Sequence, residues 1–157
     1  MKQKLISLLL LLSLLLTGCG QKAAVQSHTF DDLTIRIPED YINLSGEEYA
    51  GQLDFIFGLD PIAVNGIREE KATFEAYGLE MDLPSYGKFL MMSNNVSGEL
   101  EEKDGIHTFT YASGDYTYVV TLHETAEAFW TVQAYCATED FPKAQKDMWK
   151  ILSSVTV

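Results

Sequence analysis

Cys19 is the residue whose position and neighbours indicate a specific chemistry. It follows the small residues Thr17 and Gly18, and these come after a twelve-residue, almost wholly apolar stretch, Leu5–Leu16, with two lysines before it. A spanning helix needs about 18 apolar residues, so this stretch is typical of an export signal. A thiolate is a strong nucleophile, so Cys19 offers a reactive sulfur directly behind this segment.

The run Leu16-Thr17-Gly18-Cys19 resembles the lipobox of bacterial lipoproteins. This resemblance implies transfer of diacylglycerol to the Cys19 sulfur, cleavage before Cys19, and acylation, for instance with palmitate, of the new amino terminus. Two or more acyl chains anchor a protein stably where one chain does not. We therefore expect a signal peptide at 1–18, a lipidated cysteine and polar tether at 19–27, and one domain at 28–157, held on the extracytoplasmic face of the cell membrane. A cleaved secretory signal with an incidental cysteine, or a short membrane anchor, is the alternative.

The charge balance excludes some partners. Removing Lys2 and Lys4 with the signal leaves nine of the 11 basic residues against all 23 acidic ones. No basic stripe is present to neutralise phosphates, so nucleic acid is not expected as a partner. Adsorption to anionic lipid without an anchor is disfavoured for the same reason. The many aromatic residues favour a folded domain over a disordered one.

Cys136 has no intramolecular partner once Cys19 carries lipid. In the alternating pattern of residues 128–137 it shares a face with Trp130, Val132 and Ala134, which predicts a buried and inert thiol. A nucleophilic cysteine would need a neighbouring base, and the local sequence offers none.

Other sets of polar residues give no catalytic or metal-binding pattern. The histidines, His28, His107 and His123, fall on separate predicted strands and are interpreted as surface residues, and His123 and Glu124 should point to opposite faces. An acidic rim from Glu99 to Asp104 is compatible with a weak Ca²⁺ site, but equally with a charged edge strand that resists association. We expect no metal, no cofactor and no enzyme activity.

The elements that position these residues follow from periodicity and turn residues. Strands and two helices are predicted, with 128–137 as the central strand and Asp104-Gly105 as a hairpin turn. The predicted strands are 28–30, 33–37, 53–59, 62–69, 99–103, 106–112, 116–124, 128–137 and an edge strand at 155–157, and the helices begin near Pro84 and Asp140, the second ending at Leu152 and capped by Asp140. This order predicts an α+β fold, an antiparallel sheet with flanking helices.

Several of these segments together resemble the PsbP-like lipoproteins of anaerobic Gram-positive bacteria. The matching segments are Thr34–Glu39, Leu83–Lys88, Asp104–Tyr111, Tyr116–Tyr118, Ala128–Cys136 and Ile151–Val155. The resemblance implies an α/β/α sandwich of the Mog/PsbP-like type and a non-catalytic role beside larger assemblies. It brings no shared set of catalytic residues.

Two functions are compatible with the sequence. The first is a lipid-anchored binding or scaffold module for an envelope protein partner. The alternative is a small-molecule or glycan receptor with an aromatic-lined cleft, although aromatic residues of a sheet also serve as core and cross-strand pairs. The candidate aromatic residues are Tyr111, Tyr116, Tyr118, Phe129, Trp130 and Tyr135.

Overall fold

The structure, a computed structural model, describes residues 23–46, 49 and 51–157. The predicted signal peptide and Cys19 lie outside the described residues. Among the described helices, none combines the length and apolar character that crossing a membrane requires. The first strand begins at Val25, three residues before position 28.

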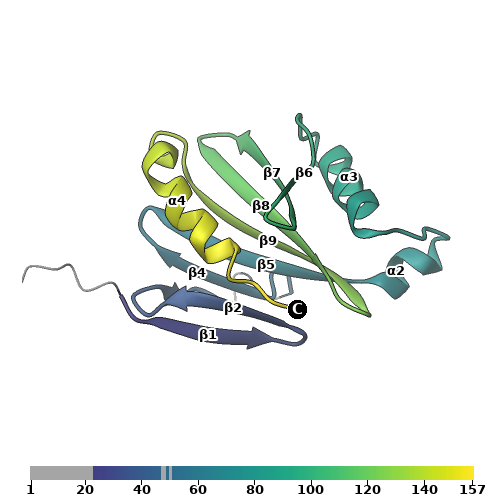
Figure 1. The fold of residues 1–157 in the computed structure, drawn as a ribbon, viewed down its shortest axis with the longest axis horizontal. Coiled ribbons are helices and arrows are strands. Elements are labelled where there is room, and N and C mark those ends of the chain that lie inside the picture. The colour runs from purple at the N-terminus through teal and green to yellow at the C-terminus, as the bar shows by residue number, and fades with distance from the viewer. Residues whose placement is uncertain (1–22, 47–48, 50) are drawn as a thin grey trace, which may run out of the picture.

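A seven-stranded antiparallel sheet forms the centre of the molecule, in the order β3-β4-β5-β9-β8-β7-β6 (Figure 1). The predicted central strand is confirmed, because β9 has three strands on each side. The strands are β3 (Ile42–Asn43), β4 (Phe55–Leu59), β5 (Ile62–Glu70), β6 (Glu101–Lys103), β7 (Ile106–Ser113), β8 (Tyr116–Glu124) and β9 (Ala128–Ala137).

The predicted turn at Asp104-Gly105 joins β6 to β7. Both residues have positive φ, 55° and 79°, as the two-residue hairpin turns that suit twisted strands require. The structure shortens the preceding strand to β6, with Glu101 and Lys103 on one sheet face and Glu102 on the other.

One face of the sheet is covered by a hairpin and the last helix. The hairpin consists of β1 (Val25–Phe30) and β2 (Leu33–Pro38), paired around Asp31-Asp32 as predicted, and the helix is α4 (Phe141–Leu152). Leu33, Ile35 and Ile37 of β2 pack with alternate residues of β9 and with the apolar stripe of α4. The predicted strand at 155–157 is reduced to one bridge between Thr156 and Thr34 of β2.

The other face is covered by α2 (Lys71–Ala76) and α3 (Leu83–Ser93), which lie at the opposite end of the view from α4 (Figure 1). Asp82 caps α3 by accepting a hydrogen bond from the Ser85 amide at 2.9 Å. The sequence did not predict α2, because six residues carry no helical stripe. Phe74 fixes this short helix by packing edge-on against the ring of Tyr86.

The predicted capping of α4 by the side chain of Asp140 is wrong. Its side chain makes no cap hydrogen bond, and its backbone carbonyl accepts from the amides of Lys143 and Ala144 at 3.0 Å instead. The remaining expectation for the fold is confirmed: helices cover both faces of an antiparallel sheet, which gives an α/β/α sandwich.

Candidate functional site

Three tyrosines stand side by side across the middle of the sheet. Tyr111 of β7, Tyr118 of β8 and Tyr135 of β9 are direct cross-strand partners, so they share one face. Their ring centroids are 4.8 Å and 5.1 Å apart, and the rings stack with interplanar angles of 9° and 25°. All three are half-buried. We call them the tyrosine row.

The tyrosine row stays uncharged at neutral pH. Burial raises the pKa of Tyr111, Tyr118 and Tyr135, and the neighbouring phenols raise it further. A neutral phenol both donates and accepts a hydrogen bond, and its hydroxyl is the part of the ring farthest from the backbone. The row therefore presents a line of neutral hydroxyl groups. Tyr116, 47 % exposed, packs edge-on against Tyr135 at its end.

A groove of about 170 Å³ continues from the row towards α3. Tyr111 belongs to both, so the row and the groove form one continuous surface. The polar residues in its lining are Glu69, Asn94, Thr131 and Gln133, and the apolar ones are Ile67, Leu90, Val96, Phe109 and Val120.

Glu69 is held in place beneath α3. The buried hydroxyl of Tyr86 donates to Glu69 Oε2 at 2.5 Å and lies 2.8 Å from Thr131 Oγ1. Burial raises the pKa of Tyr86 far above its usual range, and Glu69 adds to this effect. The ring of Tyr86 stacks on Phe129 with centroids 4.5 Å apart. These contacts fix the Glu69 carboxylate at the groove wall.

Asn65 lies beside this surface, and the sequence did not indicate it. It is 5 % exposed, and within the described part of the chain its Oδ1 has no hydrogen-bond partner. Its cross-strand partner is Gln133, which lines the groove. A buried acceptor without a partner costs about 1–3 kcal/mol. Asn65 is not among the residues that line the groove, so it lies buried beside this surface and not on it.

Two of the six predicted cleft aromatics do not belong to the site. Trp130 is fully buried on the opposite face, where its indole N–H donates to Asp32 Oδ1 at 2.7 Å. Phe129 is on the same face as the row but lies buried under Tyr86. For these two residues the core interpretation is the right one. Strand alternation turns Trp130 to the opposite face, and the ring of Tyr86 covers Phe129.

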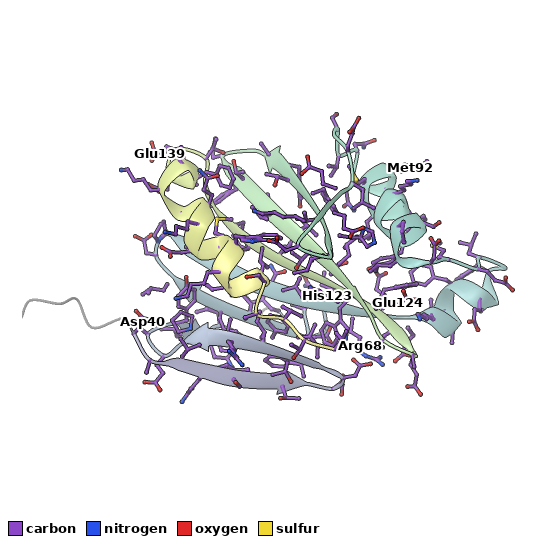
Figure 2. All side chains as sticks on the ribbon, viewed as in Figure 1. Asp40, Arg68, Met92, His123, Glu124 and Glu139 are labelled. Carbon is purple, nitrogen blue, oxygen red and sulfur yellow. The ribbon has the colours of Figure 1, made fainter. Side chains whose placement is uncertain are left out.

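The sequence predicts His123 as a surface residue, and this prediction is wrong. It is 8 % exposed, contacts Thr121 Oγ1 through Nε2 at 3.1 Å, and burial lowers its pKa to about 4. Its neighbour Glu124 ends β8 (Figure 2). The Glu124 carboxylate forms an ion pair with Lys71 Nζ at 2.8 Å. Across residues 23–46, 49 and 51–157, no group of three metal-ligating side chains comes together.

The remaining cysteine has the predicted setting. Cys136 is 1 % exposed, and its Sγ lies 3.8 Å from Met148 Sδ of α4. Burial raises the pKa of the thiol, and Asp140 adds to this effect. The thiol is therefore a core group, on the face opposite the tyrosine row.

A second hollow of about 670 Å³ lies between the end of α4 and the β1–β2 hairpin. Its rim carries both charges, Arg36 and Lys150 against Asp40, Asp60 and Asp147, all of them exposed. This hollow is larger than the groove, but its charged groups are exposed and of both signs, and the groove is the one that is continuous with the tyrosine row.

Comparison with known proteins adds a likeness of fold. No protein-family model matches the chain, and no curated protein matches it. Among solved structures, it is similar to the solution structure of cyanobacterial PsbP (CyanoP) from Synechocystis sp. PCC 6803, with a TM-score of 0.53 and 14 % identity over 89 % of this chain and 95 % of that one. The chain has a PsbP-like fold.

Proposed function

We propose that the protein is a non-catalytic binding module, anchored by lipid on Cys19 at the extracytoplasmic face of the cell membrane, and that the tyrosine row and its groove are its ligand side. The observation that supports the binding role is the continuous surface formed by the groove and the tyrosine row on one face of the sheet. This surface combines half-buried aromatic rings with the polar side chains of Asn94 and Gln133 in the groove lining.

The placement of the reactive side chains supports a non-catalytic role. Cys136 and His123 are both buried on the face opposite the groove, so neither reaches a ligand held there. Glu69 accepts a hydrogen bond from Tyr86, a phenol whose raised pKa keeps it protonated at neutral pH, so Tyr86 cannot serve there as a general base. The resemblance to PsbP-like lipoproteins points the same way.

The lipobox-like run before Cys19 supports the anchor. Five residues separate Cys19 from the start of β1 at Val25, and fully extended they span at most about 18 Å. An acidic domain on so short a tether would need the lipid itself to stay at an anionic surface.

Metabolic labelling with radioactive palmitate in a bacterial host tests the anchor. Label should appear in the wild-type protein and in Cys136→Ala, and should be absent from Cys19→Ala. If Cys19→Ala still carries label, the anchoring proposal is wrong.

Site-specific photo-crosslinking in host cells tests the binding side. A photoreactive phenylalanine analogue at Tyr116, beside the row, should give a discrete product. The same group at Met92, 80 % exposed on the outside of α3, is the matched control (Figure 2). A product at Met92 with none at Tyr116 would place the ligand side on the helices instead.

A further inference from the structure

We infer that the ligand of this site is a neutral carbohydrate chain, with one sugar residue in the groove and the next residues along the tyrosine row. The inference rests on the proposed function, because it names the ligand class of the same surface.

The charge of the groove selects against anions. Its lining contains one carboxylate, Glu69, and no lysine, arginine or histidine. A phosphate, sulfate or carboxylate group would enter without a counter-charge and beside a negative one, which is costly in a partly buried site. The ligand should therefore be neutral or cationic.

The stacking of the tyrosine row selects against an organic cation. Tyr118 has Tyr111 on one ring face and Tyr135 on the other, at centroid distances of 4.8 Å and 5.1 Å. A cation binds over a free aromatic face, and these faces already contact each other. The row offers its edges and hydroxyls, which suit a ligand that forms hydrogen bonds.

The polar groups of the site match hydroxyl groups of a sugar. Asn94 uses its Nδ2 to bond the Leu90 carbonyl at 2.9 Å, which leaves its Oδ1 as an acceptor. Gln133, also in the lining, offers both a donor and an acceptor through its side-chain amide. A sugar hydroxyl both donates and accepts, so it can satisfy such a mixed set without any net charge.

The shape of the site also fits a chain of sugars. Leu90, Val96 and Val120 line the groove with apolar groups, which suit the C–H faces of a sugar ring. At about 170 Å³ the groove is smaller than the cavities that enclose a drug-sized ligand, so it has room for one small unit of a longer chain. The tyrosines then follow at intervals comparable to the length of one sugar residue in an extended glycan.

Titration of the chain from residue 19 onward, carrying Cys19→Ala, tests this inference without lipid. The probes are N-acetylglucosamine and its β-1,4-linked trimer, cellotriose, inorganic phosphate and tetramethylammonium, followed by calorimetry and amide NMR spectra. We expect a trisaccharide to bind, more tightly than its monosaccharide, and to shift the side-chain amides of Asn94 and Gln133. Phosphate and tetramethylammonium should shift neither.

Three variants locate the binding. Asn94→Ala and Gln133→Ala should each weaken trisaccharide binding about tenfold, the loss expected for one good hydrogen bond. Asn94 is exposed at the end of α3, so its substitution leaves the core intact. Met92→Ala, on the outer side of the same helix, should bind as the wild type does.

Three results would overturn the inference: no binding of either trisaccharide at millimolar concentration, equal binding in Asn94→Ala and the wild type, or shifts caused by tetramethylammonium instead. A crosslinked protein partner at Tyr116 combined with no saccharide binding would reject the carbohydrate and keep the binding module. Absence of palmitate label from the wild-type protein would reject the anchor and leave the carbohydrate inference standing.

Discussion

The indole N–H of Trp130 donates a hydrogen bond of 2.7 Å to Asp32 Oδ1, and this contact ties the central strand of the sheet to the tip of the β1–β2 hairpin. Arg68 Nε of β5 reaches the same oxygen at 3.3 Å. Burial alone would raise the pKa of Asp32, but hydrogen bonds from Thr125, Trp130 and Arg68 outweigh it and lower the pKa to about 2. The hairpin is thus held to the sheet by an ionised carboxylate as well as by apolar packing.

The first prediction concerns this carboxylate. The folded protein holds Asp32 ionised more strongly than the unfolded chain does, so its contribution is complete above about pH 4 and is lost as the pH falls towards 2. For a side chain that is 34 % exposed we expect about 1 kcal/mol after solvent screening. Urea unfolding of the wild type and Asp32→Asn between pH 5 and 2 measures it.

The control for Asp32 is its neighbour in the turn. Asp31 has φ 47°, a conformation that asparagine tolerates, so Asp31→Asn removes a charge without straining the turn. The free-energy gap between wild type and Asp32→Asn should narrow with acid, while Asp31→Asn keeps the wild-type profile. Parallel profiles for wild type and Asp32→Asn would contradict the prediction.

The second prediction concerns His123. Burial lowers its pKa from 6.5 to about 4, so the unfolded chain takes up a proton at a higher pH than the folded protein does. Stability should therefore fall as the pH drops from about 6.5 to 4, by about 3 kcal/mol in all for this buried group. His123→Gln is less stable at pH 8 but does not titrate, so its stability should fall less across that interval. Equal slopes would show that His123 is not the group responsible.

The third prediction uses two glycines of neighbouring strands. A Cβ at Gly66 would lie 2.2 Å from the ring of Phe55, which is fully buried and cannot move aside. Gly66→Ala should therefore lower the free energy of unfolding by about 1–3 kcal/mol. At Gly58 the nearest atom is the tip of the exposed Leu44 side chain at 2.9 Å, which can rotate away. Thermal unfolding should separate the two variants, and an equal loss in both would refute the packing argument.

The fourth prediction concerns thiol reactivity. Cys136 is buried against Met148, and burial raises its pKa, so in the Cys19→Ala chain it should resist a thiol reagent such as dithionitrobenzoate until urea unfolds the protein. A cysteine at the exposed position of Thr138, in a Cys136→Ala background, should react at once. Rapid reaction of Cys136 in the native protein would show that α4 opens from the sheet.

Local patterns were sufficient to predict most strands. Turn residues such as Asp104-Gly105 determine which residues of a hairpin face each other, so the pairing of Tyr111 with Tyr118 follows from the turn between β7 and β8. Alternation then correctly placed Cys136 and Trp130 on one face. The short α2 was missed, because contacts with the rest of the domain, rather than its own sequence, hold it.

The site itself depends on pairings that no local pattern contains. Asn65 and Gln133 are 68 positions apart and become partners only because β5 lies next to β9. Glu69 is held at the groove by the hydrogen bond from Tyr86, which joins β5 to α3. The sequence could therefore name the tyrosines as candidates, but not the amides and the carboxylate that surround them.

The two edge strands of the large sheet determine whether neighbouring copies of the domain can pair edge to edge. β6 ends the sheet on one side with Glu101, Glu102 and Lys103, and β3 ends it on the other with only two residues. Charged or very short edge strands are poor templates for a further strand. Proteins confined to a surface meet one another far more often than proteins free in solution. With both edges of the large sheet closed to strand addition, copies of this domain held at a surface by the proposed lipid anchor would be able to lie close together without their sheets fusing.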